Sequence, residues 1–203
     1  MGEDIRERRE LVAKYRKPEH PISELFVNRW SPRAMSGEVI SDAELMALFE
    51  AARWAPSSYN AQQWRFIYAK RETKYWPIIF GLLDSFNQSW CGNAAVLVVI
   101  VSRKNFEYDN KPSRTHSFDT GAAWENLALQ GSLNNLVVHG MQGFDYDKAQ
   151  RVLQIPEDFQ IEAMCAIGWP GSTKDLPEDL QKREFPSDRK HVQEIAFEGI
   201  FKL

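Results

Sequence analysis

The chain has 203 residues, of which 43% are hydrophobic and 26% are charged, and its formal net charge is -3. This composition predicts a globular protein with one domain over residues 1–203, and the weak negative charge excludes a general attraction to nucleic acid or to an anionic membrane. Cys91 and Cys165 lack C-x-x-C spacing, so we expect no disulfide scaffold, no zinc site and a reducing, cytoplasmic location.

The first half of the chain predicts three helices and two strands. Residues 4–17 are a charged helical candidate within an N-terminal extension, residues 1–20, and they contain no apolar run of the kind found in signal peptides. Ser41 and Glu44 form a capping box, which predicts a helix that ends near Trp54 because Pro56 follows shortly. Further elements are expected as a strand at 64–69, a helix at 75–87 and a buried central strand at 94–101.

The second half begins with a polar, irregular stretch and continues with a long helix from residue 118 to about 138. That helix is small and apolar on several faces, as expected for a helix buried in a protein or dimer core. We then expect a loop at 140–145, a helix at 146–153, a strand at 161–168 and a C-terminal extension at 172–203. Helices and strands without regular βαβ alternation indicate an α+β domain.

Several familiar catalytic signatures are absent from the sequence. No G-x-G-x-x-G follows a strand, and neither G-x-x-x-x-G-K-[ST] nor G-x-S-x-G occurs. The four histidines have no metal-binding spacing, so no metal is expected. If the protein is an enzyme, its chemistry therefore resides in a cofactor, and we expect no catalytic side chain.

Other segments are candidates for binding that cofactor, although each has an ordinary structural alternative. Arg29, Ser31 and Arg33 could clamp a phosphate, or they could be surface residues beside a turn. The remaining candidates could equally be turn, helix-end or solvated tail residues: Pro56, Ser57, Ser58 and Asn60 in one loop, Asn87 before the central strand, Gln142 and Gly143 in a glycine-containing loop, and Arg189 near the C-terminus.

The order and spacing of these segments resemble the FMN-dependent nitroreductase family over residues 25–189. The carrying motifs are R-x-S-x-R at 29–33, A-A-R-x-A-P-S-S with N-x-Q-x-W at 51–64, N-Q-x-W at 87–90, F-D-T-G-A-A at 118–123, H-G-M-Q-G-F-D at 139–145 and I-G-W-P at 167–170. Gln63 and Ala95 stand where the family usually has proline, and both differences look structural.

The resemblance implies a nitroreductase-like fold, with a central, mostly antiparallel sheet flanked by helices in an intertwined homodimer. It implies FMN at the dimer interface, NAD(P)H as the electron donor and a small acceptor such as a nitroaromatic, a quinone or an enal. No nucleic-acid or membrane partner is expected.

The resemblance also assigns roles to the candidate residues. Arg29 and Ser31 would hold the FMN phosphate with Arg189, and Arg33 would lie near the pyrimidine end of the ring. Pro56, Ser57, Ser58 and Asn60 would reach the flavin from the neighbouring subunit, Asn87 would bond to the ring edge, and Gln142 and Gly143 would present N–H groups near the flavin N5.

Alternatives within and outside enzymology remain open at the level of sequence. A related flavoprotein with a narrower acceptor would share all these motifs, and acceptor choice would depend on the segment covering the flavin, for which residues 105–116 are our candidate. A non-catalytic FMN-binding or regulatory protein is the second reading, and a structural dimer without cofactor is the third.

Overall fold

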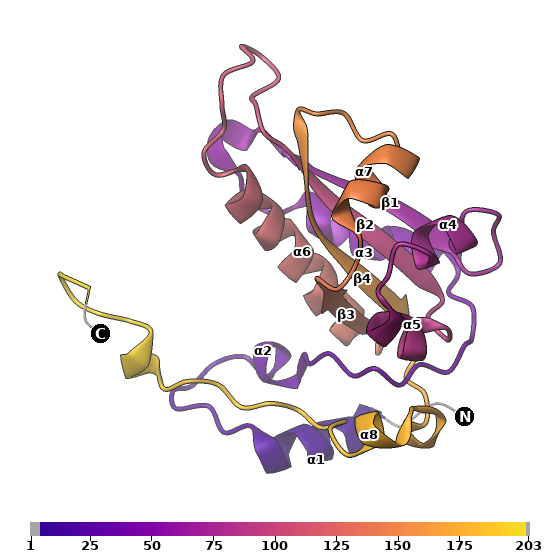
Figure 1. Ribbon diagram of the computed structural model, residues 1–203. Coiled ribbons are helices and arrows are strands. Elements are labelled where there is room, and N and C mark those ends of the chain that lie inside the picture. Colours follow the sequence, from indigo (N-terminus) through magenta and orange to yellow (C-terminus); the bar gives the residue numbers. More distant parts are fainter. Residues whose placement is uncertain (1–4, 202–203) are drawn as a thin grey trace.

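The computed structural model describes residues 5–201 and is built around a four-stranded sheet with the order β1-β2-β4-β3 (Figure 1). The strands are β1 (Trp64–Lys70), β2 (Val96–Arg103), β3 (Val137–Met141) and β4 (Phe159–Gly168). All three pairings are antiparallel. The predicted α+β class with a mostly antiparallel sheet flanked by helices is confirmed.

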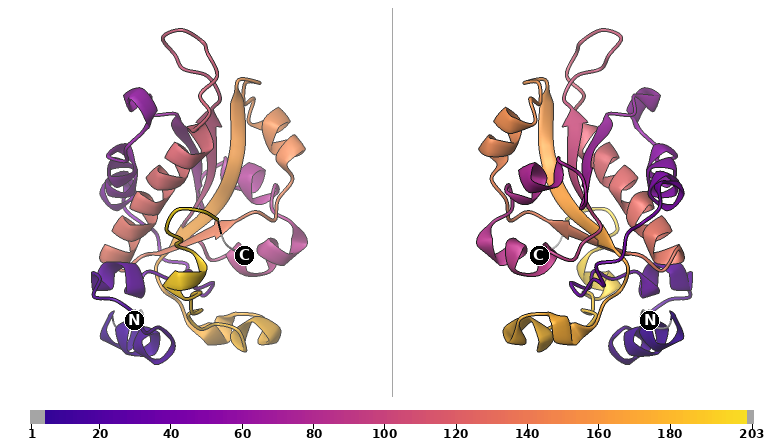
Figure 2. Two further views of the ribbon diagram at one scale, coloured as in Figure 1. Left: turned by 90° about the vertical axis from the view of Figure 1, so that its left-hand side faces the viewer. Right: turned by 90° about the vertical axis from the view of Figure 1, so that its right-hand side faces the viewer.

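Helices cover both faces of the sheet, as the side views show (Figure 2). On one face lie α3 (Asp42–Arg53) and α6 (His116–Leu133), and on the other lie α4 (Trp76–Phe80), α5 (Ser85–Cys91) and α7 (Tyr146–Val152). Away from the sheet lie α1 (Ile5–Tyr15), α2 (Glu24–Asn28) and α8 (Glu178–Gln181), and short 3-10 turns occur at η1 (Ser58–Asn60), η2 (Thr173–Asp175) and η3 (Val192–Glu194).

The central strand β2 explains how one sheet supports two cores. Successive side chains of a strand point to opposite faces. Val96, Val98 and Ile100 pack toward α3 and α6, whereas Leu97 and Val99 pack toward the other helices. Both faces of this strand are therefore buried, which is why its sequence is continuously apolar instead of alternating.

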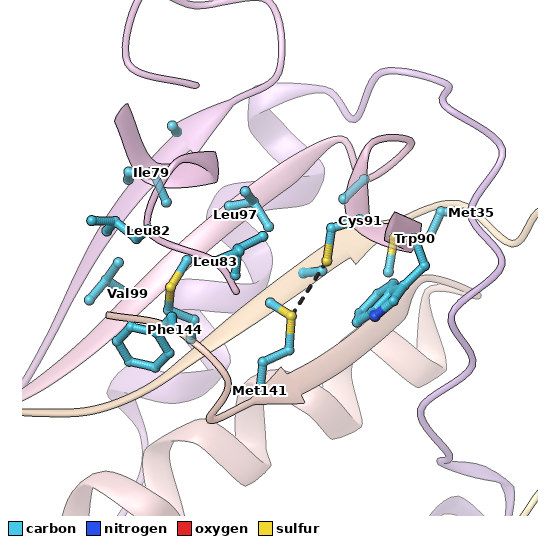
Figure 3. Close-up of a cluster of buried hydrophobic side chains, with 14 of the residues drawn as sticks. Met35, Ile79, Leu82, Leu83, Trp90, Cys91, Leu97, Val99, Met141 and Phe144 are labelled. Atoms are coloured by element: carbon cyan, nitrogen blue, oxygen red, sulfur yellow. Dashed lines mark hydrogen bonds between the residues drawn. The ribbon is translucent and has the colours of Figure 1, made fainter. Parts of the chain in front are cut away.

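The second core lies beneath α4 and α5 and includes a contact between two sulfur-containing side chains (Figure 3). The thiol of Cys91 points to the Met141 sulfur, and the two atoms are 3.4 Å apart. Ile79, Leu82 and Phe144 complete this side of the sheet. This packing fixes α5 against β3 and thereby positions the loop that follows β3.

Most predicted elements are confirmed, including the capping box of α3 and the short helix α7. The charged N-terminal helix is also present, although residue 4 lies outside the described part of the chain. The predicted helix at 75–87 is instead two short helices. The chain leaves the helical path after Phe80, Leu83 pairs with Phe144, and Asp84 then caps the start of α5.

The predicted helix to residue 138 was also too long, and the predicted loop at 140–145 begins too early. Asn135 adopts a left-handed conformation with φ 59, and the N–H of Leu136 donates to the carbonyl of Gly131 at 2.8 Å. A left-handed residue with such a bond is a common helix ending. The apolar residues that follow therefore belong to β3 and not to α6.

Candidate functional site

Arg29 immediately follows α2 and lies against α6. Its side chain is 17% exposed, and its Nε atom lies 3.4 Å from Oε1 of Glu125. This Nε makes no hydrogen bond within the described part of the chain, so the contact with Glu125 is an ion pair without a directed bond. The Arg29 guanidinium consequently keeps donor capacity for an anionic group.

Arg33 is held by a carboxylate from the C-terminal extension. The N–H groups of Arg33 and Ala34 both donate to Oε1 of Glu184, the second at 2.8 Å. The other oxygen of Glu184 lies 3.5 Å from Nη1 of Arg33, and the Glu184 side chain is only 3% exposed. Glu184 therefore fixes both the backbone and the charge of Arg33, a role that no motif in the sequence indicated.

His139 connects this arginine-containing segment to the sheet. Its ring lies 4.6 Å from that of Trp90, and its Nδ1–H donates to the carbonyl of Pro32 at 3.0 Å. Burial and, to a smaller extent, the positive charge of Arg33 lower the pKa of His139 to about 4. The ring is therefore neutral at neutral pH and acts as a hydrogen-bond donor to the backbone.

Asn87 and Gly143 form the next part of the site. Asn87 Nδ2 donates to the carbonyl of Gly143 at 2.9 Å, and Oδ1 accepts from Nε1 of Trp90 at 3.2 Å. A Cβ atom at Gly143 would lie 2.2 Å from a carboxylate oxygen of Asp84 and 2.6 Å from Asn87 Nδ2. Only glycine fits here, because any larger residue would collide with Asp84 and Asn87.

The loop that carries Ser57, Ser58 and Asn60 is attached to the N-terminal end of α6. The N–H of Ser58 donates to Oδ2 of Asp119 in the first turn of that helix at 3.0 Å. Tyr59 and Asn60 both have positive φ, at 52 and 55. Left-handed conformations of residues other than glycine are costly and concentrate at functional loops, and Tyr59 has no local compensation of the kind Asn offers.

The structure thus divides the predicted site residues into two groups. Contacts run from Pro32 through His139 and Trp90 to Asn87 and Gly143. The 56–60 loop is instead at the upper end of α6 in Figure 1. The 105–115 loop leads into this same end of the helix. Within one chain the loop does not join the first group.

The predicted C-terminal residue, Arg189, lies in an exposed segment. Its Nη1 donates to the carbonyl of Ser187 at 3.3 Å and to that of Asp188 at 3.0 Å. Its positive charge also lowers the pKa of Arg16, as does that of Arg29, so both charges act on Arg16. Arg16 precedes every motif that sequence reasoning singled out, and no pattern pointed to it.

These features fit a phosphate-bearing cofactor. The Nε atoms of Arg29 and Arg33 are both buried and make no hydrogen bond within residues 5–201. Buried donors without partners are costly, and an anionic ligand would satisfy them. The chain therefore offers two cationic donors, close in sequence, to an anionic group.

Two further findings bear on the kind of protein. Among the helices of residues 5–201, none is long and apolar enough to cross a membrane. The same part of the chain contains no group of three or more His, Cys, Asp or Glu side chains arranged to hold a metal ion.

Comparisons with known proteins agree with the geometry. A family model described as the nitroreductase family matches residues 27–89 and 82–169. A crystal structure described as an oxidoreductase containing FMN is 44% identical, covers 92% of this chain and 96% of its own, and superimposes with a TM-score of 0.89.

A more distant sequence relative and a more distant solved structure also match. A protein of Archaeoglobus fulgidus, provisionally named an NADH dehydrogenase/NAD(P)H nitroreductase, is 26% identical over 171 residues, which are 82% of this chain and 94% of the relative. A provisionally named nitroreductase from Desulfovibrio desulfuricans, solved in complex with FMN, is 20% identical, covers 91% of this chain and 100% of its own, and has a TM-score of 0.69.

Proposed function

The chain belongs to the nitroreductase family, and from this premise we propose that it is an FMN-dependent NAD(P)H oxidoreductase. When bound, FMN would supply the redox chemistry, relaying electrons in a ping-pong cycle from NAD(P)H to a small acceptor such as a nitroaromatic, a quinone or an enal. The observation that carries the proposal is that Arg29 and Arg33 each have a buried Nε atom without a hydrogen-bond partner among the described residues.

The phosphate end would be bound by cationic and hydroxyl donors. Arg29 and Ser31 would hold the phosphate, with Arg189 completing the contacts. Arginine suits this task because its planar guanidinium offers several fixed donors to phosphate oxygens. Glu125 pairs with Arg29 and would keep its guanidinium oriented.

The ring end would be bound by the other side of the site. Arg33, held by Glu184, would place a positive charge near the pyrimidine edge, where it stabilises negative charge on the reduced ring. The amide of Asn87 has a second N–H and a second lone pair that could reach the ring edge. Gln142 and Gly143 would offer their backbone N–H groups to the ring. The carbonyl of Gly143 already accepts from Asn87.

We further propose that a homodimer completes the site. Pro56, Ser57, Ser58 and Asn60 would serve the flavin of a second copy, because they lie apart from the other candidates within one chain. Two large apolar side chains at the two ends of α6 support this, since Phe118 is 80% exposed and Leu133 is 61% exposed. A second copy that covered them would remove this apolar surface from water.

The remaining proposals concern extent and location. Residues 1–203 would form a single FMN-binding domain, with 1–20 and 172–203 as extensions packed on it. A contact between the two extensions, the stacking of Tyr15 on Phe185 at 5.1 Å, supports this organisation. Cys91 and Cys165 are free and buried, which supports the predicted reducing, cytoplasmic location.

FMN titration of the flavin-free protein tests the proposal. Quenching of flavin fluorescence should saturate at one FMN per chain, and Arg29→Ala should weaken binding by about ten-fold or more, since charge-assisted bonds to phosphate are among the stronger polar contacts. Arg151→Ala, an exposed arginine on α7, is the matched control and should bind as the wild type does. Failure of the wild type to bind FMN would refute the proposal.

A non-catalytic FMN-binding protein is the alternative function. It would pass the titration but would not be reduced rapidly by NADH or NADPH.

A further inference from the structure

Arg16 joins three parts of the chain that are distant in sequence. Its Nε donates to the carbonyl of Ser187 at 2.8 Å, and its Nη1 donates to the carbonyls of Val27 at 2.8 Å and Arg29 at 2.7 Å. One guanidinium therefore ties the end of α1 to the backbone of Arg29 and to the C-terminal segment. Such use of a fixed fork of donors is specific to arginine.

Further contacts hold the N-terminal segment 15–19 beside the C-terminal segment 185–192. The ring of Tyr15 stacks on Phe185, with an interplanar angle of 17°. Further along, Glu19 accepts from the N–H of Val192 at 2.8 Å. The two segments run side by side in Figure 1, and the chain between Ser187 and Val192, which includes Arg189, is anchored at both ends.

The charges around Arg16 are unbalanced in favour of cations. Burial and, after it, the positive charges of Arg189 and Arg29 together lower the pKa of Arg16 to about 10, while Asp188 acts in the opposite direction. Three guanidinium groups thus interact with only two carboxylates, Asp188 and Glu125, the latter 3.4 Å from Nε of Arg29. A phosphate dianion would balance this excess.

We propose that Arg16 is the positioning residue of the phosphate site: by binding the backbone at Arg29 and at Ser187, it makes Arg29 and Arg189 converge on one phosphate. This inference rests on the proposed FMN function and extends it to a residue outside the R-x-S-x-R motif. Arg16 spends its Nε and Nη1 donors on carbonyl groups, so it acts through the residues it holds.

The test compares FMN with riboflavin, which has the same ring and no phosphate. Dissociation constants of both are measured for flavin-free wild type and for Arg16→Ala. The proposal predicts a rise of roughly ten-fold in the Kd for FMN and a change of less than about two-fold for riboflavin, because only phosphate contacts are disturbed. Arg9→Ala, which removes the same charge from the exposed face of α1, should leave both constants unchanged.

A second substitution separates position from charge. Arg16→Lys keeps the positive charge but has one nitrogen in place of the guanidinium fork, so it cannot serve carbonyls on both segments at once. Its FMN affinity should fall as that of Arg16→Ala does. Full retention of FMN affinity in Arg16→Lys would overturn the positioning role, and so would an equal loss of FMN and riboflavin affinity in Arg16→Ala.

The same data distinguish this inference from the proposed function. If the wild type shows no preference for FMN over riboflavin, the proposed FMN site fails as a whole. If the wild type prefers FMN and Arg29→Ala loses that preference while Arg16→Ala keeps it, only the role of Arg16 is refuted.

Discussion

Gly143 has no room for a side chain on its Cα atom. A methyl group there would collide with Asp84 and with Asn87. Gly143→Ala should therefore displace the Asn87 amide, weaken FMN binding and destabilise the protein by about 2 kcal/mol, as is usual for overpacking. Thermal melts and FMN titration check this. Gly92→Ala is the matched control, since a Cβ there meets nothing within 4 Å, and equal behaviour of the two variants would contradict the account.

His139 predicts a dependence of stability on pH. Its pKa is near 4 in the folded protein and 6.5 in the reference state, so the unfolded chain binds the proton first as the pH falls. Its contribution to stability is therefore complete above about pH 6.5 and is lost between pH 6.5 and 4. We expect the free energy of unfolding to fall by about 2 kcal/mol over this range. This value is smaller than for a fully buried ring, because the His139 ring is partly open to solvent.

Urea unfolding at pH 7 and at pH 4.5 measures this dependence. His139→Gln, which keeps a donor but cannot titrate, should show a smaller fall in unfolding free energy than the wild type. If the wild type and His139→Gln lose the same free energy of unfolding between the two pH values, the pH dependence comes from other groups.

The sequence identified the residues of the site that belong to short motifs, and it missed those defined by distant partners. Arg29 and Arg33 were predicted because their spacing is local. Glu184, His139 and Arg16 act on backbone groups far away in the chain, and such contacts leave no pattern in the sequence. Whether the predicted residues bind FMN remains a prediction.

Among the elements, the 105–116 loop is our candidate for controlling the electron acceptor. Phe106 of this loop meets Tyr59 edge-on, with ring centroids 5.8 Å apart, so the loop lies beside the strained 56–60 loop. Its end is anchored where Ser117 donates to Glu162 at 2.7 Å. The position supports our proposal that residues 105–116 cover the flavin.

Replacing residues 106–111 by a short glycine-containing turn tests this proposal. The bridge between Asn105 and Pro112 supplies a base for the new turn, so we expect the fold to persist. The ratio of turnover with a quinone to that with a nitroaromatic should change by about ten-fold, a modest change in transition-state binding, while FMN stays bound. An unchanged ratio would contradict the proposal, as would loss of FMN.

Helix and strand boundaries show what a local pattern can establish. The start of α3 was predicted correctly because its capping box is local. The strand β3 was merged into the preceding helix, because apolar residues continue past Leu133 at helical spacing. The left-handed Asn135 ends the helix, and pairing with β4 then determines the strand. Strand pairing is non-local, so periodicity alone could not reveal it.

At the scale of the whole molecule, the account requires a dimer in which each copy supplies a loop to the other. Phe118 is exposed on α6, one residue before Asp119, whose carboxylate accepts from the N–H of Ser58 in the 56–60 loop. Phe118→Asp should lower the mass in solution to that of a monomer, because a buried unpaired charge costs several kcal/mol, and FMN should be lost with it.

Light scattering and FMN content measure the two effects together. Ile78→Asp, on α4 at the other face of the sheet, adds the same charge and is the control. A Phe118→Asp protein that is monomeric and retains FMN with wild-type affinity would show that one chain suffices for the site.

If this chain uses bound FMN to oxidise a nicotinamide, the absorbance spectrum of the flavin must change when the nicotinamide is added. The purified protein, supplied with FMN, is recorded before and after anaerobic addition of NADPH or NADH. We expect two flavin bands that bleach upon addition and return when a quinone or a nitroaromatic is added. Bands that persist with both nucleotides would contradict the oxidoreductase account, and a protein that takes up no FMN would contradict the site itself.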